Sequence, residues 1–216
     1  MYNNVTLVLT SCNRVDLLER TLRSLGKELL ESIPHKIIVD DSGDPAVRNY
    51  FSQFSEREGW QILLNEENIG HPHSVDKAYN LVKTPYIFHC EDDWEFTNTS
   101  FISECLDILE FDKQVLQVTF REGCPHAVEP QVYLTPSKVS YQIKERGWRG
   151  EWWGFTYNPS IFRKAAYDSV GLYAGKKEQT IAKKYYDLGY HTVALTTKCV
   201  HHIGDGRGTY SYKDLI

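Results

Sequence analysis

The sequence contains no apolar run near the roughly 20 residues that a membrane-spanning helix needs. Its first residues, Met1–Val5, lack the basic start and apolar core of a secretory leader. Basic charge is also in short supply, because 24 Lys and Arg face 29 Asp and Glu and leave a formal net charge of −5. We therefore expect a cytoplasmic protein without a membrane span, and not a general nucleic-acid binder, whose footprint would be basic.

Paired cysteines are missing as well. The five cysteines are odd in number and scattered, with no CxxC pair: Cys12, Cys90, Cys105, Cys124 and Cys199. Reduced thiols are the simplest account, and no Cys/His spacing supports a zinc site. The chain also shows no internal repeat or linker, so its 216 residues, 41% of them hydrophobic, predict one domain over residues 1–216. We expect a monomer or a weak dimer.

The first part of the chain alternates strand and helix patterns. Apolar, β-branched runs predict strands at residues 5–9, 36–39, 61–64 and 86–90. Between them lie a helical stripe from Val15 to Leu29, a helix opened by Asp44-Pro45, and a helix carrying Val75, Ala78 and Val82. This alternation predicts an α/β fold with a doubly wound, mostly parallel sheet.

The second part is less regular. A helix is expected from Thr99-Ser100, a strand at residues 115–120, a late helix at 180–188 and a strand at 191–195. Residues 123–148 contain three prolines and predict irregular structure.

Three adjacent acids, Glu91-Asp92-Asp93, follow the apolar run at residues 86–90. Like charges crowded at a strand end repel one another unless a cation offsets them. Ligands of open α/β sheets bind at the carboxyl ends of the strands. The acids therefore predict a divalent cation and an anionic ligand at this edge; the alternative is a solvated acidic turn.

Four motifs occur in order, each at the end of a strand or in a loop: Val5 to Arg14, Ile37 to Asp44, Asn68-Ile69-Gly70 and Glu91-Asp92-Asp93. Together they resemble the opening strand, the VDD signature, the NxG loop and the DxD motif of inverting family 2 glycosyltransferases with the GT-A fold. The resemblance is clear for residues 4–96 and traceable to about residue 206. It implies a nucleotide-sugar-binding half at 1–96 and an acceptor-binding half at 97–216.

The resemblance also implies the reaction. A sugar would move from a UDP- or GDP-sugar donor to a hydroxyl of a glycan or glycoprotein, with Mn²⁺ or Mg²⁺ on the diphosphate. By similarity Asp93 ligates the metal, and Asp92 faces the ribose or reaches the metal through water. Glu91 replaces the usual first Asp, so it is only a possible ligand. The alternative for Asp93 is a helix cap or a surface acid.

The nucleotide would lie against the first two strand ends. By resemblance Asp41 accepts a hydrogen bond from the base, and Thr10 and Asn13 line the same pocket. Alternatively, Asp40 and Asp41 only form a turn with Ser42-Gly43. Arg14 is expected to approach a phosphate or to pair within its own helix.

Inversion requires a carboxylate that takes the acceptor proton. The family places this base after a Glu near the start of a late helix, but here the segment reads Lys177-Glu178-Gln179. One register puts Gln179, which cannot accept the proton, at the base position. The spacing to Gly189 selects Glu178, and the alternative is an ordinary helix N-terminal Glu.

The segment from Cys199 to Gly208 resembles the C-terminal VxHxG element, in which a His completes the metal shell. His202 matches that His better than His201 does. Arg207 in the following glycine loop would neutralise the diphosphate, or would lie in an exposed turn. Upstream, Trp152, Trp153 and Gly154 would line the donor and acceptor sugar cleft, although at least one Trp is expected to be core packing.

Two rival functions remain at this point. A sugar-1-phosphate nucleotidyltransferase needs a glycine-rich loop after the first strand, and residues 10–13 offer no glycine. A non-catalytic nucleotide-sugar or glycan binding module would tolerate the imperfect motif at Glu178-Gln179.

Overall fold

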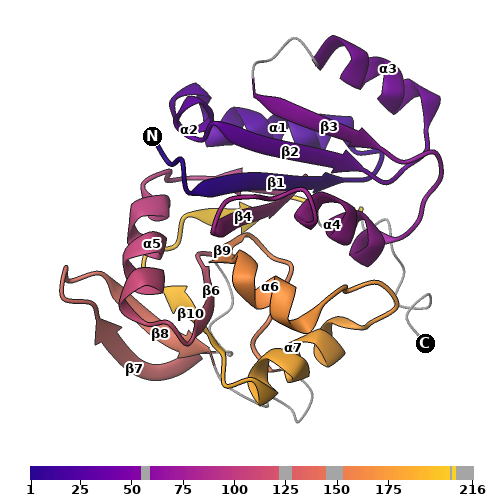
Figure 1. Ribbon diagram of the computed structural model, residues 1–216. Coiled ribbons are helices and arrows are strands. Elements are labelled where there is room, and N and C mark those ends of the chain that lie inside the picture. Colours follow the sequence, from indigo (N-terminus) through magenta and orange to yellow (C-terminus); the bar gives the residue numbers. More distant parts are fainter. Residues whose placement is uncertain (55–58, 122–127, 145–152, 205, 208–216) are drawn as a thin grey trace.

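A computed structural model describes residues 1–54, 59–121, 128–144, 153–204 and 206–207. A nine-stranded sheet runs through the protein in the order β3-β2-β1-β4-β9-β6-β10-β8-β7 (Figure 1). The strands are β1 (Val5–Ser11), β2 (His35–Asp40), β3 (Trp60–Leu64), β4 (Tyr86–Glu91), β6 (Val115–Thr119), β7 (Val128–Leu134), β8 (Ser140–Lys144), β9 (Ser160–Arg163) and β10 (His191–Leu195).

The predicted parallel arrangement is confirmed for the first four strands. β1 pairs in parallel with β2 and β4, and β2 pairs in parallel with β3. Further along, β9 runs antiparallel between β4 and β6, and the sheet ends in the antiparallel strands β8 and β7. The sheet is therefore mixed but mostly parallel in the part that carries the sequence motifs.

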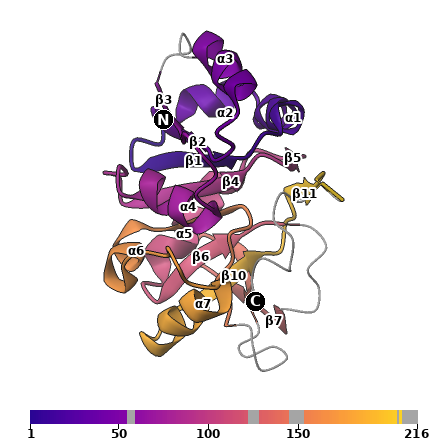
Figure 2. The ribbon, with the colours of Figure 1, turned by 90° about the vertical axis from the view of Figure 1, so that its right-hand side faces the viewer.

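Helices cover both faces of the sheet (Figures 1 and 2). Buried side chains place α1, α2, α3 and α5 on one face and α4, α6 and α7 on the other. Their bounds are α1 (Val15–Leu25), α2 (Lys27–Ser32), α3 (Pro45–Phe54), α4 (His71–Tyr79), α5 (Phe101–Phe111), α6 (Lys164–Val170) and α7 (Glu178–Asp187).

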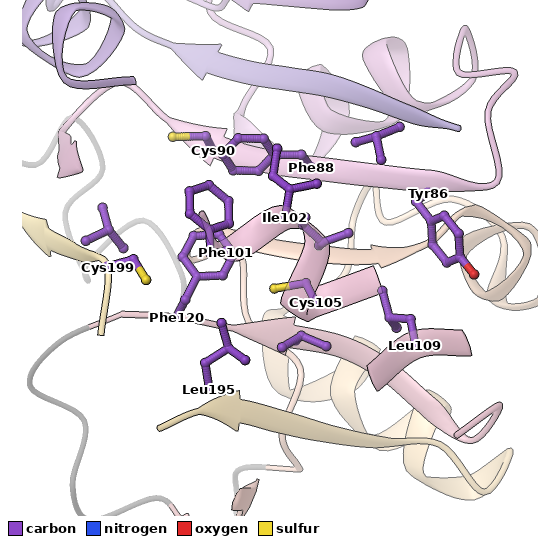
Figure 3. Packing of buried hydrophobic residues seen from close by; sticks show 14 of the residues in the cluster. Tyr86, Phe88, Cys90, Phe101, Ile102, Cys105, Leu109, Phe120, Leu195 and Cys199 are labelled. Carbon is purple, nitrogen blue, oxygen red and sulfur yellow. The ribbon is translucent and has the colours of Figure 1, made fainter. Parts of the chain in front are cut away.

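The core is continuous across the sheet. One cluster joins β1 and β4 of the first part to α5, β6 and β10 of the second part through fully buried rings (Figure 3). Within it Phe101 stacks on Phe120 at a centroid distance of 4.2 Å and meets Phe88 edge-on at 5.3 Å. Because these rings belong to α5, to the residue after β6 and to β4, packing fixes the two parts of the chain against each other.

Two expectations about local structure were wrong. The stripe from Val15 to Leu29 is not one helix: the chain breaks at Gly26, whose φ of +75° a glycine adopts most readily, and α2 then begins. Part of residues 123–148, predicted to be irregular, forms the hairpin of β7 and β8. Its only described proline within a strand, Pro130, lies in the edge strand β7, where a missing N–H is tolerated.

A second sheet of two short strands lies beside the main one. β5 (Trp94–Phe96) pairs antiparallel with β11 (Val200–His202), and Figure 2 shows them side by side. This pairing brings the C-terminal part of the chain back to the residues that follow the three acids. Within the described residues, no helix has both the length and the apolar character needed to cross a membrane.

Candidate active site

The motif residues meet because parallel strands end at the same edge. The register pairs Thr10 of β1 with Val39 of β2 on one side and with Glu91 of β4 on the other. The residues that continue each strand are thereby brought to one edge, as the sequence predicted.

Asp92 is enclosed by partners from the first strand and its following turn. Its side chain is fully buried, and its carboxylate accepts hydrogen bonds from the guanidinium of Arg14 and, at 3.0 Å, from Ser11 Oγ. Burial raises the pKa of Asp92 to about 6, and the positive charge of Arg14 limits this rise. The expected ribose partner is thus held inside the protein by Arg14.

Arg14 links Asp92 to Asp93. Its Nη1 lies 2.7 Å from Asp93 Oδ2, so one guanidinium faces two carboxylates. Burial opposes the charge of Arg14, yet the two carboxylates together raise its pKa. The expected ion pair within its own helix is wrong, because both partners lie at the end of β4. The guanidinium of Arg14 supplies the positive charge beside these acids, a role that the sequence analysis assigned to a metal ion.

His202 reaches Asp93 from the far end of the chain. The pairing of β5 and β11 sets His202 opposite Trp94, and His202 Nε2 lies 3.1 Å from Asp93 Oδ2. His201 points the other way and lies 3.0 Å from Glu95 Oε2. This alternation is the one expected of neighbouring strand residues. The structure therefore brings His202, and not His201, to the acid proposed as a ligand.

Gly204 makes room for the Asp93 carboxylate. A Cβ at this position would lie 2.3 Å from Asp93 Oδ2, closer than any real contact. The backbone supports the same approach, because Ile203 N–H donates to the Asp93 carbonyl at 2.9 Å. The segment after β11 is thus shaped around Asp93.

Glu91 is the last residue of β4. It accepts a 3.0 Å hydrogen bond from Trp94 Nε1. Burial, reinforced by the charges of Asp93, Asp92 and Glu178, raises the pKa of Glu91 to about 8. Glu178, the first residue of α7, is therefore close enough to act on Glu91, although 87 residues separate them in the chain.

Asp41 organises the loop that leads into α4. It is buried, and its carboxylate accepts from Ile69 N–H and Gly70 N–H, both at 2.9 Å, and from Asn65 Nδ2 at 2.8 Å. Asp40 instead serves the local turn with Ser42. The two acids thus differ in role: one closes the turn and the other holds the NxG loop.

Thr10 and Asn13 lie at the end of β1 and in the turn after it. Thr10 is buried with its Oγ1 3.4 Å from His71 Nε2, and Asn13 adopts a φ of +54° with its side chain 3.2 Å from Asp44. Asn tolerates this left-handed conformation better than most residues.

Two histidines of the site, His71 and His89, escaped the sequence analysis. The rings of His71, His89 and Tyr157 lie together, with centroid distances of 4.6 Å between His71 and Tyr157 and 6.1 Å between His89 and Tyr157. Burial lowers the pKa of His71 to about 4 and that of His89 to about 3, so both are neutral near pH 7. No sequence spacing links them, since they come from α4, β4 and the segment before β9.

Two polar atoms of this aromatic group are buried without a partner among the described residues. They are His89 Nε2 and the Tyr157 hydroxyl. Buried polar atoms in folded proteins are normally hydrogen-bonded, so each is a candidate contact for a ligand. The sequence analysis also missed Trp94. Its indole N–H donates to Glu91, and its ring centroid lies 4.9 Å from that of His202.

The residues expected at the sugar cleft are less concentrated. Trp153 packs against Tyr186 at 4.6 Å and under Lys183 of α7, and Gly154 has a φ of +100° beside Thr192. Trp152 lies outside the described residues. Arg207 pairs with Asp16 of α1 at 2.7 Å, which makes it part of an exposed contact between its loop and α1.

One hollow of the described part lies elsewhere. It measures about 1020 Å³ and lies at the amino ends of β2 and β3, between α1, α2 and Tyr50. Its buried Lys36 already donates to the carbonyls of Leu30 and Ile33. We place the site at the acids, because there the charged groups converge.

The donor set at Asp93 fits a divalent metal in chemical type. A carboxylate and an imidazole suit Mn²⁺, with a diphosphate completing the coordination. The described residues contain no cluster of three or more His, Cys, Asp and Glu arranged to hold an ion by themselves. A cation here would therefore depend on ligand oxygens as well as on Asp93 and His202.

Comparison with known proteins agrees with this geometry. The sequence model of glycosyl transferase family 2 matches residues 6–171, and the chain belongs to that family. No protein with a curated description matches the chain.

Solved structures show the same fold. Residues 1–349 of TarS from S. aureus superpose with a TM-score of 0.65 at 12% identity, over 93% of this chain and 60% of that one. The mannosyltransferase PcManGT from Pyrobaculum calidifontis, in complex with GDP-Man and Mn²⁺, gives 0.63 at 16% identity, over 96% and 59%. GalNAc-T7 with UDP, GalNAc and Mn²⁺ gives 0.68 at 11%, over 94% and 44%.

These neighbours are GT-A glycosyltransferases, so the predicted fold is confirmed. The chain spans about 60% or less of the length of each of the three.

Proposed function

We propose that the protein is a metal-dependent, inverting transferase that moves a sugar from a UDP- or GDP-sugar to a hydroxyl of a glycan or glycoprotein. The acceptor oxygen bonds to the anomeric carbon from the face opposite the leaving group. The bond from that carbon to the diphosphate breaks, and its electron pair leaves with the nucleoside diphosphate. The acceptor proton passes to a carboxylate.

One observation carries the proposal: Asp93, His202 and Gly204 come together from segments more than 100 residues apart, with 3.1 Å between the two side chains. A fold that only needed stability would not gather a carboxylate, an imidazole and a side-chain-free approach beside two further acids. In the neighbours PcManGT and GalNAc-T7 the complexes contain Mn²⁺ with GDP-Man or with UDP and GalNAc. A metal held by Asp93 and His202 would neutralise charge on the departing diphosphate.

Arg14 supports a charge-exchange role at the same place. Its guanidinium neutralises Asp92 and Asp93. A metal bound at Asp93 would supply that positive charge, and Arg14 would then be free to turn toward a phosphate. The Arg14 pairing therefore supports, rather than opposes, its proposed nucleotide role.

Glu178 is the proposed base. It lies at the first turn of α7, where its charge acts on Glu91 and on the Tyr157 hydroxyl. A carboxylate whose charge reaches both Glu91 and Tyr157 is suited to accept a proton from an incoming hydroxyl. The Tyr157 hydroxyl and His89 Nε2, which have no hydrogen-bond partner among the described residues, would then contact hydroxyl groups of the donor sugar.

The test is a calorimetric titration of UDP, GDP and the matching nucleotide-sugars, with and without Mn²⁺, into the wild type and Asp93→Asn. We expect one base to bind with a clear preference, and only when Mn²⁺ and Asp93 are both present. If the nucleotide affinity is the same with and without Mn²⁺, and the same in the wild type and Asp93→Asn, metal dependence at this site is refuted. Conversion of the bound donor by the wild type would then exclude the non-catalytic alternative.

A further inference from the structure

A further buried carboxylate, Asp76 of α4, lies outside the acid trio. Its side chain is 5% exposed, and no positively charged side chain is among its described hydrogen-bond partners. A carboxylate removed from water without a counter-charge needs strong hydrogen bonds in compensation. The identity of these bonds shows what Asp76 holds.

Asp76 holds the loop between α6 and α7. Its Oδ1 accepts from Tyr173 N–H and from the Tyr167 hydroxyl, both at 2.9 Å, and its Oδ2 accepts from Ala174 N–H at 2.8 Å. Two consecutive backbone amides are therefore bound by one side chain, almost 100 residues away in the sequence. Such a pair of bonds fixes both the position and the direction of the loop.

Only three residues separate this anchored loop from Glu178. They form a tight turn, in which Lys176 N–H donates to the Tyr173 carbonyl at 3.0 Å and Gly175 adopts a φ of +70°. The buried hydroxyl of Tyr173 also lies 2.5 Å from that of Tyr185 within α7. The start of α7 is consequently fixed relative to Asp76 with little freedom in between.

The N-terminus of α4 lies at the nucleotide-binding edge. Gly70, which precedes α4, and Ile69 donate their N–H groups to Asp41. Asn65 bridges Asp41 and Ser74 of α4 at 2.8 and 2.7 Å. One short helix, α4, thus connects Asp41, which is expected to contact the nucleobase, with the loop that precedes Glu178.

We propose that Asp76 is a positioning residue, which sets the Glu178 carboxylate against the donor edge through the Tyr173–Ala174 loop. The proposal rests on the proposed function, in which Glu178 is the base. In this proposal α4 does more than pack against the sheet. It holds the catalytic carboxylate of Glu178 at a fixed position relative to the nucleotide-binding edge. A base displaced by an ångström loses much of its effect while the nucleotide site is unchanged.

The test compares Asp76→Asn with Tyr167→Phe. The amide of Asn must point an N–H at either Tyr173 N–H or Ala174 N–H, so one loop bond is always lost. Tyr167→Phe removes the third hydrogen bond to Asp76 and leaves both loop bonds in place, which makes it the matched control. Val47→Ala, in the separate cluster under α3, controls for a general loss of stability.

Two measurements are made on each variant. Amide hydrogen exchange reports the order of residues 173–181, and steady-state kinetics use the nucleotide-sugar selected by the titration above. For Asp76→Asn we expect faster exchange at 173–181 with unchanged exchange in β1 and β2, a kcat at least tenfold lower, and UDP or GDP affinity in Mn²⁺ within twofold of wild type. Tyr167→Phe and Val47→Ala should keep their kcat.

The proposal is overturned if Asp76→Asn keeps the wild-type kcat, or if its nucleotide affinity falls in step with kcat. Should that variant not fold, Asp76→Glu retains the charge and both acceptors but shifts them by one methylene, and the same readings apply. Glu178→Gln is measured in parallel. If it retains full turnover, the proposed base is refuted; if it is inactive while Asp76→Asn is not, only the positioning role fails.

Discussion

Residues 1–96 and residues 97–207 share one sheet but contribute different parts of the candidate site. The first region is a regular parallel unit whose strand ends carry the acids and Arg14, and their charges are largely satisfied within the region. The second is antiparallel in part and rich in buried tyrosines, and it returns His202 and Glu178 to the first region. Neither region therefore contains the candidate site alone: the first supplies the charged edge, and the second supplies His202 and Glu178, the proposed metal ligand and base.

The sharpest contrast between the regions concerns chemistry and binding. Glu178→Gln, in the second region, should lower turnover by about 10²- to 10⁴-fold, because the amide cannot accept the acceptor proton. Nucleotide affinity, which we assign to the first region, should stay within twofold. Initial rates and calorimetry check both, with Gln179→Glu as the control for a change beside the base. Unchanged turnover in Glu178→Gln would remove the proposed base.

The second prediction asks whether the regions are one unit in stability. Phe101→Ala removes a fully buried ring that contacts both regions, and should lower the free energy of unfolding by about 3–5 kcal/mol. Phe111→Ala on the same helix, at an exposed position, should change it by less than about 0.5 kcal/mol. Urea unfolding followed by fluorescence measures both. A single transition in each case supports a shared core; two separate transitions would contradict it.

The third prediction concerns the loss of folding stability at low pH. His89 has a folded-state pKa of about 3 because it is buried, whereas the unfolded value is about 6.5. Protonation therefore favours the unfolded state, and the stability that the neutral ring contributes above pH 6.5 is lost as pH falls toward 3. Between pH 6.5 and 4.5 the loss should be about 2–3 kcal/mol.

His89→Asn, which retains an acceptor for the Tyr79 hydroxyl, should flatten this decline in urea titrations at pH 7 and pH 4.5. The exposed His73→Asn serves as the control. An equal decline in wild type and His89→Asn would show that other groups cause the acid sensitivity.

The fourth prediction tests the contact at which the regions meet. Gly204→Ala places a Cβ 2.3 Å from Asp93 Oδ2, so the loop must move away from the carboxylate. Nucleotide affinity in Mn²⁺ should fall about 10- to 100-fold, as when a metal's supporting groups are displaced. Gly206→Ala disturbs the same loop without meeting an atom within 4 Å, and should lose less. Equal losses in both variants would point to loop strain alone.

The smallest effect is expected at Tyr157. Its hydroxyl is buried without a partner among the described residues, so Tyr157→Phe should leave stability unchanged or raise it by up to about 1 kcal/mol. If that hydroxyl contacts the donor sugar, affinity for the nucleotide-sugar should fall about 2- to 10-fold while affinity for the free nucleotide is kept. Calorimetry with both ligands separates the cases, and equal affinities for wild type and variant would exclude the contact.

Much of the first region could be predicted because its signals are local. Apolar runs of strand length and the cap at Asp44, which accepts from Ala46 N–H at 2.8 Å, need no distant partner to be interpreted. The missed hairpin at β7 and β8 depends on pairing with β10, and the break at Gly26 depends on a backbone conformation that an apolar stripe does not reveal. No local pattern indicated that His71 and His89 gather beside Tyr157, because the three residues come from separate segments.

By itself the sequence determined the family, the parallel edge and the placement of the acids at its carboxyl end, since strand periodicity and strand order fix where such residues emerge. The tertiary structure decided what those acids meet. Arg14 lies between Asp92 and Asp93, His202 reaches Asp93 through the pairing of β5 and β11, and Asp76 binds the loop before Glu178. These contacts join residues 70 to 110 positions apart, and strand pairing together with the packing of α4 against the loop between α6 and α7 brings them within hydrogen-bond distance.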